Sequence, residues 1–104
     1  MNGLAQGVWT YWDEFGYRTS KITFQDGMEE GYAIIWSPNE VSWEEGNFHE
    51  GERQGLWTKF YQGKMVSRGN FNHNLRTGWW MNWDAVTSLP LVNQHYQDGR
   101  LLWP

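Results

Sequence analysis

A period of 23 or 24 residues constrains this chain more than any other feature of its sequence. Four glycines, Gly7, Gly31, Gly55 and Gly78, each begin a segment with aromatic or aliphatic side chains at fixed offsets. A later aromatic residue and a turn residue complete each unit. A fixed period in this range is typical of stacked arrays, in which each unit buries its apolar side against its neighbours. We therefore expect one repeat domain over residues 1–104, with units at about 7–30, 31–54, 55–77 and 78–104.

Each unit has the pattern of a β-hairpin. The residues after each opening glycine are mostly β-branched or aromatic, which favours pleated strands. Turn formers such as Asp13-Glu14-Phe15-Gly16 and Asp26-Gly27 separate the strands, and no long 3.6-residue apolar period indicates a helix. The last unit is irregular, with Pro90 inside its second strand and a tail over 101–104, which is typical of a terminal cap. The sequence predicts an all-β fold: a single twisted antiparallel sheet of about eight strands, built from four β-hairpin repeats.

Alternation along the first strand of each hairpin gives the sheet two faces. We call one the Trp79 face, and in these strands it carries Val8, Thr10, Trp12, Tyr32, Ile34, Trp36, Leu56, Thr58, Phe60, Trp79, Met81 and Trp83. We call the other the Trp80 face, and it carries Trp9, Tyr11, Ala33, Ile35, Trp57, Lys59, Trp80 and Asn82. Because the Trp79 face is more uniformly apolar, we expect it to be the packed side. The recurring aromatics are expected to join adjacent hairpins through cross-strand pairs.

The middle of the chain resembles the MORN-repeat family, and especially its bacterial variant, whose members are often described as antitoxins. Residues 46–63 and 69–80 are similar to the family pattern G-x-F-x-x-G-x-x-x-G-x-W-x-x-Y-x-x-x-G. The resemblance extends over nearly the whole chain. Departures from it are Ile22 and Asn74 in place of glycines, Ala33 in place of the tryptophan, and the proline-broken last unit. The resemblance implies a scaffold without catalytic residues and an antitoxin or immunity role.

Composition excludes several classes of protein. The chain has no cysteine, which excludes disulfides, thiolate nucleophiles and cysteine-ligated zinc. Its first residues lack the basic start and apolar run of a signal peptide, and no stretch approaches the roughly 18 apolar residues of a membrane helix. We therefore expect a cytoplasmic protein with no membrane partner.

The candidate catalytic and cofactor patterns are weak. The glycines precede strands rather than helices, so they do not predict a phosphate loop. His49 and His73 occupy equivalent positions in successive hairpins, roughly 9–10 Å apart, which is too far for one metal ion. Paired acids such as Glu29 and Glu30 lack the desolvated cleft that a glycosidase needs. We expect no enzyme activity, no cofactor and no metal.

Charge is strongly segregated along the chain. Residues 22–52 contain eight acidic residues and no lysine or arginine, whereas residues 53–83 contain five basic residues and no acid. One interpretation is internal pairing, since the strand with Glu44 and Glu45 should run antiparallel beside the strand with Lys59. The other is recognition of a basic partner, because eight acids outnumber five bases. The predicted partner-binding residues are Glu29, Glu30, Trp43, Glu44, Glu45, Glu50 and Glu52.

The predicted function is that of a non-enzymatic protein-binding module. An inhibitor, antitoxin or immunity protein of this kind would dock an acidic aromatic face onto the basic surface of a toxin, nuclease or nucleic-acid-binding complex. One alternative is a phage-encoded anti-CRISPR or other anti-defence inhibitor, and another is a carbohydrate or cell-wall binding module. A homodimer formed through a sheet edge or face is a further option. The net charge of −4 argues against direct binding of nucleic acid.

Overall fold

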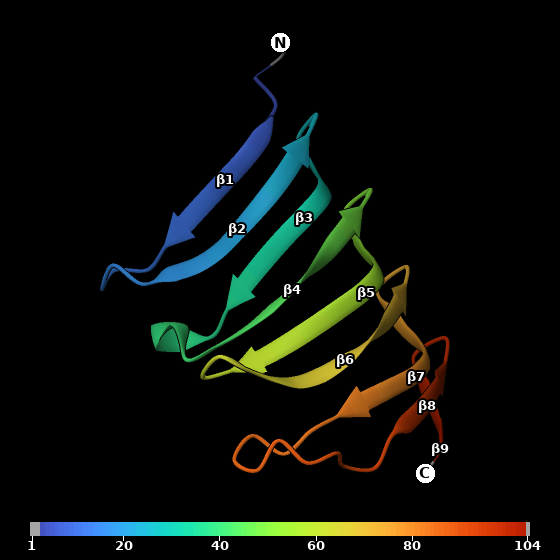
Figure 1. The fold of residues 1–104 in the computed structure, drawn as a ribbon. Helices are drawn as coiled ribbons and strands as arrows, with labels where there is room; N and C mark the ends of the chain where they lie inside the picture. The colour runs from blue at the N-terminus through green and yellow to red at the C-terminus, as the bar shows by residue number, and fades with distance from the viewer. Residues whose placement is uncertain (1–2, 104) are drawn as a thin grey trace.

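The computed structural model describes residues 3–103 and folds them into one open antiparallel sheet (Figure 1). Its nine strands follow one another in sequence order, so every hydrogen-bonded neighbour is also the neighbour along the chain. The strands are β1 (Gly7–Trp12), β2 (Arg18–Gln25), β3 (Met28–Trp36), β4 (Ser42–His49), β5 (Glu52–Tyr61), β6 (Lys64–Asn72), β7 (Leu75–Asn82), β8 (Gln94–Gln97) and β9 (Arg100–Trp103). The predicted all-β antiparallel sheet is confirmed, but it has nine strands rather than about eight.

The additional strand comes from the segment that we expected to be an irregular cap. After β8 the chain turns at Asp98 and Gly99. Strand β9 then pairs with β8, and the first cross-strand pair is Gln97 with Arg100. Pro90 lies in the loop between β7 and β8 rather than within β8. In this loop it forms an isolated bridge with Trp83. A proline has no amide hydrogen to donate to a ladder, so strand pairing resumes only beyond it. One short 3-10 helix, η1 (Pro38–Glu40), lies between β3 and β4.

Four tight turns at one end of the sheet share the same backbone geometry. The central pairs Asp26-Gly27, Glu50-Gly51, His73-Asn74 and Asp98-Gly99 all have positive φ at both residues. Such pairs form the type I′ turns that match the twist of antiparallel strands, and asparagine tolerates this conformation. In each turn the second residue donates its amide to the carbonyl of Ala5, Glu29, Arg53 or Arg76, at 2.8–3.0 Å. Asn74 therefore fulfils the role that glycine has in the other three turns. We call this end of the sheet, at the upper right in Figure 1, the turn end.

The buried side chains lie on the Trp80 face, so our prediction of the packed face was wrong. Ala33, Phe48, Trp57 and Trp80 are buried, whereas Val8 and Trp79 on the other face are 59% and 52% exposed. Overall apolarity does not decide which face packs. The Trp80 face packs because a glycine in the preceding strand leaves space for each buried tryptophan ring, and the sequence prediction did not use this glycine.

Each buried tryptophan lies over a glycine. A Cβ atom at Gly46 would overlap the Trp57 ring, and one at Gly69 would overlap the Trp80 ring. The Trp57 indole donates a hydrogen bond to the Asn47 carbonyl at 3.0 Å, and Trp80 repeats this contact with Asn70 at 3.1 Å. Close packing and a satisfied N–H together bury a large ring at little polar cost.

The contact between the first and second units uses the opposite combination of sizes. Ile22 stands where the later units have Gly46 and Gly69, and its direct cross-strand partner is Ala33, which stands where they have tryptophan. A large residue facing a small one fills the same space in either order. The two departures from the repeat pattern therefore compensate each other.

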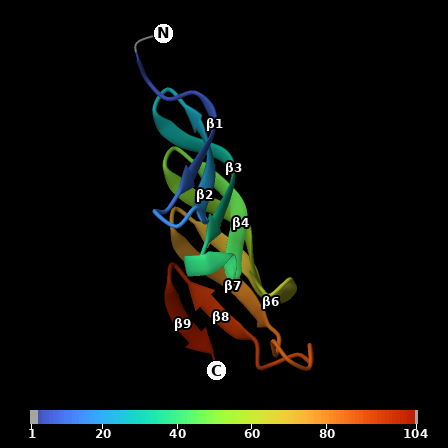
Figure 2. The ribbon, with the colours of Figure 1, turned by 90° about the vertical axis from the view of Figure 1, so that its left-hand side faces the viewer.

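The sheet has a single layer. Figure 2 shows it from the side, with no second layer of strands or helices against either face. Its Cα atoms extend 48 × 32 × 16 Å with a radius of gyration of 15.3 Å, whereas a compact domain of this length has about 13 Å. Among the described residues, nothing covers the Trp79 face.

Candidate binding site on the uncovered face

The Trp79 face presents large apolar side chains to solvent across almost the whole sheet. Residues on this face that are 42–61% exposed come from β1, β3, β5, β7 and β9: Val8, Trp12, Tyr32, Leu56, Trp79, Met81 and Trp103. Trp79 is held in place by stacking on His95, with ring centroids 4.7 Å apart, and by an edge contact with Trp103. These rings are therefore ordered by neighbours on the same face while one side stays open to solvent.

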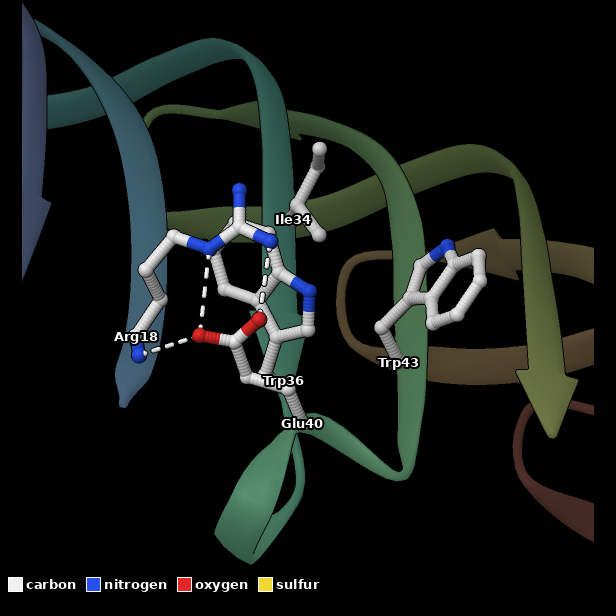
Figure 3. Close-up of a pocket in the computed structure, with 5 residues that line it drawn as sticks. All are labelled: Arg18, Ile34, Trp36, Glu40 and Trp43. Carbon is white, nitrogen blue, oxygen red and sulfur yellow. Dashed lines mark hydrogen bonds and ion pairs between the residues drawn. The ribbon is translucent and has the colours of Figure 1, made fainter. Parts of the chain in front are cut away.

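A pocket lies on this face near the β3–β4 connection (Figure 3). Its volume is about 320 Å³, and it is lined by Arg18, Ile34, Trp36, Glu40 and Trp43. Trp36 and Trp43 are cross-strand partners, and Figure 3 shows Trp36 next to Ile34 on one strand and Trp43 on the neighbouring strand. The Trp43 ring is nearly parallel to Phe60, at 5.1 Å between centroids. The predicted partner-binding residue Trp43 thus forms one wall of this pocket.

An ion pair forms the other wall of the pocket. The Arg18 guanidinium lies 4.2 Å from the centre of the Trp36 ring and donates to Glu40 at 2.8 and 3.2 Å. The Arg18 backbone amide donates to the same carboxylate at 2.7 Å. These hydrogen bonds lower the pKa of Glu40 and raise the pKa of Arg18, so both groups stay charged. The two charges neutralise each other. The pocket therefore has aromatic walls, a fixed hydrogen-bond donor in Arg18 and a fixed acceptor in Glu40.

Sequence reasoning missed Arg18 as a site residue. Arg18 and Glu40 are 22 residues apart, and the 3-10 turn brings Glu40 back over the sheet with a positive φ of 57°. Trp36 was recognised only as a recurring aromatic position. A signal in the sequence was available only for Trp36 and Trp43, because the turn geometry cannot be predicted from residue spacing.

A continuous row of side chains crosses the middle of the Trp79 face. Each member is the direct cross-strand partner of the next, from β1 to β7: Thr10, Lys21, Ile34, Glu45, Thr58, Arg68 and Met81. We call this the central row. The Glu45 carboxylate accepts a hydrogen bond from the Tyr32 hydroxyl. Burial, together with this bond, raises the pKa of Tyr32 to about 12. Tyr32 therefore remains a donor at neutral pH and fixes Glu45 in position.

The seven predicted partner-binding residues do not share one surface. Trp43 and Glu45 lie on the Trp79 face, but Glu44 points to the other face, where Arg53 binds it at 2.9 Å. As expected, the strand with Glu44 runs antiparallel beside the strand with Lys59, but the ion pair of Glu44 is with Arg53. The other four acids lie at the turn end: Glu29, Glu30, Glu50 and Glu52.

Histidines partly compensate the acids of the turn end. His49 Nδ1 lies 3.0 Å from Glu30, and its Nε2 lies 3.7 Å from Glu50. The hydrogen bond between His49 and Glu30 raises the pKa of His49 and lowers the pKa of Glu30. The Glu30 carboxylate also accepts a hydrogen bond from the Glu50 backbone amide. His73 lies 3.3 Å from Glu52. In the described part of the chain, no three His, Asp or Glu side chains are placed to hold a metal ion.

Comparisons with known proteins give no relative. No protein-family model matches the chain, and a search of curated proteins found no significant match. Within residues 3–103, no helix has the length and apolarity required to span a membrane. Functional conclusions therefore depend on the geometry of the sheet itself.

Proposed function

We propose that this chain is a non-enzymatic protein-binding module of MORN-like repeats whose Trp79 face is covered by a protein surface. The observation that carries the proposal is the open aromatic face of a single-layer sheet. Monomeric proteins rarely leave contiguous apolar patches larger than about 300–600 Å² in water. A sheet that keeps ordered tryptophans exposed across its strands is typical of an interface.

The surface area of the molecule supports a missing partner. A compact protein of this mass exposes roughly 6,100 Å², whereas this sheet exposes 6873 Å². The excess, roughly 700–800 Å², is close to the roughly 800 Å² that each side buries in a standard interface. Covering one face would bring the exposed area to that of an ordinary globular protein.

Charge favours a basic partner. The net charge is −4, and four of the predicted acids gather at the turn end. Complementary charge mainly accelerates and orients association. An inhibitor, antitoxin or immunity protein that covers a basic toxin or nuclease has this character, and a phage-encoded anti-CRISPR or anti-defence inhibitor would have it too.

The MORN-like assignment is supported by recurring geometry. The tryptophan–glycine contact and the type I′ turn with its amide hydrogen bond both recur with the spacing of the sequence repeat. Both recurring features belong to the scaffold, which is consistent with a role in binding.

Affinity capture from the native host, read by mass spectrometry, tests this function. We expect one basic protein to be recovered by the wild-type chain and lost with Trp43→Ala, which removes an anchor on the open face. Glu50→Lys at the turn end should weaken its recovery, whereas Glu14→Lys, the same charge change at the opposite end, should not. Equal recovery of every protein by all four chains would refute the proposal.

A second candidate function, carbohydrate binding, is favoured by the pocket alone. Its volume of about 320 Å³ lies at the lower end of the range for small-ligand sites. Aromatic walls with a fixed Arg18–Glu40 pair suit a sugar ring, which needs both stacking and hydrogen-bond partners. A tryptophan-fluorescence titration with oligosaccharides tests it: a saturable shift that is insensitive to salt and absent in Trp43→Ala would support a sugar site, and a flat titration would exclude the sugars used.

A further inference from the structure

From β3 to β7, the central row has a pattern of chemistry that is symmetric about β5. On one side of Thr58 lie Glu45 and then Ile34, and on the other side lie Arg68 and then Met81. At equal distances from the centre, an acid is thus matched by a base and an apolar side chain by another apolar side chain. A row with this pattern is complementary to its own reversed copy.

The row of Phe60 has the same property. Towards η1, Phe60 on β5 is flanked by its partners Trp43 and Met65, both apolar. Two rows across β4, β5 and β6 are therefore each matched about the same strand.

We infer that the Trp79 face is the interface of a homodimer, in which two sheets pack face to face about a two-fold axis parallel to β5. This inference rests on the proposed function and names its partner surface as a second copy. Rotation about this axis keeps positions along the strands and exchanges β4 with β6. Glu45 then faces Arg68 of the second copy, Ile34 faces Met81, and Trp43 faces Met65. Sheets packed in this way lie about 10 Å apart and interdigitate their side chains.

The sequence repeat explains how this complementarity arises. Glu45 and Arg68 are equivalent positions of the second and third units, 23 residues apart, and lie on opposite sides of β5. The acidic second unit and the basic third unit then meet across the axis. Arg18 binds Glu40 and Arg53 binds Glu44 within the chain, whereas Glu45 and Arg68 pair between the two copies in the dimer.

The area available on this face is sufficient. The excess exposure of the single-layer sheet, roughly 700–800 Å² per copy, equals what each side of a standard interface buries. Because the axis runs along the strands, the turn ends of both copies lie at the same end of the dimer. The acids of both copies would then form one larger acidic surface that remains free for a basic partner.

A charge reversal across the axis tests the pairing. Sedimentation equilibrium of the purified full chain should give a dimer, and Arg68→Glu should weaken self-association by at least about tenfold, since two carboxylates then face each other. Glu45→Arg should weaken it to a similar degree. The double variant Glu45→Arg/Arg68→Glu should restore association towards that of the wild type. Loss without restoration would overturn the proposed pairing.

A control variant separates interface charge from fold stability. Lys59→Glu makes the same change on β5 but on the opposite face, where Lys59 is also exposed. The dissociation constant of the Lys59→Glu dimer should equal that of the wild-type dimer. Circular dichroism melts of each variant report stability, so a variant that fails to fold is recognised and replaced by Arg68→Gln, for which a smaller loss of association is expected.

Cross-linking tests the position of the axis directly. The chain has no cysteine, so Thr58→Cys introduces a single thiol at the centre of the interface. A short bis-maleimide should join two copies of Thr58→Cys, and it should not join copies of Ser67→Cys, which lies on the Trp80 face. A monomer at millimolar concentration, or a dimer in which neither Thr58→Cys cross-links nor the charge variants act, would overturn the inference. The latter result would indicate pairing through β1 or β9 instead.

The outcomes also separate this inference from the proposed function. A monomer that loses its captured partner on Trp43→Ala overturns the homodimer and leaves the binding function standing. A dimer confirmed by charge restoration and cross-linking that captures no basic protein supports the homodimer and overturns the basic-partner function.

Discussion

The two faces of this sheet contain similar numbers of aromatic rings, but the rings are buried on one face and exposed on the other. On the Trp80 face, Trp57 and Trp80 are 2% and 4% exposed, while their neighbour Trp79 on the other face is 52% exposed. The buried rings lie over Gly46 and Gly69, and the exposed ring has no such glycine beneath it. In a single-layer sheet, a ring is buried by the gap that an adjacent strand leaves for it rather than by the apolarity of its face.

The largest expected effect comes from removing a ring on each face in turn. Trp57→Ala empties the space over Gly46 and should lower the free energy of unfolding by about 3–5 kcal/mol. Trp79→Ala removes an exposed ring and should cost less than about 1 kcal/mol in the folding of one chain. Urea denaturation at low protein concentration measures both. Similar losses for the two variants would mean that the glycine contact does not distinguish the faces.

A size exchange in the second unit sharpens the comparison. Ala33→Trp places an indole against Ile22 and should destabilise the sheet by about 1–3 kcal/mol through overpacking. Adding Ile22→Gly recreates the arrangement of Gly46 with Trp57 and should recover part of that loss. Thermal melts of the single and double variants check this, and an additive loss would contradict the proposed compensation.

A smaller effect is expected from the cations that cover the buried rings. The Arg53 guanidinium lies 4.3 Å from the centre of the Trp57 ring and also binds Glu44. Arg53→Lys keeps the charge but loses the planar stack and the forked hydrogen bonds, and should cost about 0.5–1 kcal/mol. Arg68→Lys, at an exposed position of the Trp79 face, serves as the control. We expect it to leave the urea midpoint of the dilute chain unchanged.

The smallest effect concerns pH and the turn end, which belongs to neither face. The pKa of His49 is raised by Glu30, so its contribution is fully present below 6.5 and is lost as pH rises through the folded value. The pKa of Glu30 is lowered, so its contribution is present above 4.5 and is lost as pH falls through its folded value. The pair should stabilise the fold most between pH 4.5 and 6.5. The difference in urea midpoint between the wild type and His49→Gln should peak there, and a difference that is flat with pH would contradict it.

Turn chemistry made much of the fold predictable from sequence. Glycine, asparagine and aspartate at fixed spacing located the tight turns, and regular turns with short strands leave few alternatives to a sheet in sequence order. The ninth strand was missed because Pro90 and the length of the β7–β8 loop obscured the pairing of the residues that follow.

The site was less predictable because it depends on which residues face one another across strands. Trp43 was identified from its type and position, but Arg18 depends on the reversal of η1, which sequence spacing does not reveal. The packed face was predicted wrongly because we counted apolar residues within one strand. The deciding residues, Gly46 and Gly69, lie in the strand before each tryptophan.

Each buried tryptophan packs on a glycine of the preceding strand, so this contact has a direction along the chain. Both glycines, Gly46 and Gly69, lie in the N-terminal strand of the pair, and both rings, Trp57 and Trp80, lie in the C-terminal strand. Trp9, which has no described strand before it, is 46% exposed and directs its indole N–H to the Gln6 carbonyl. The β1 edge therefore carries a ring that rests on no glycine, and a strand with a well-placed glycine would extend the array there.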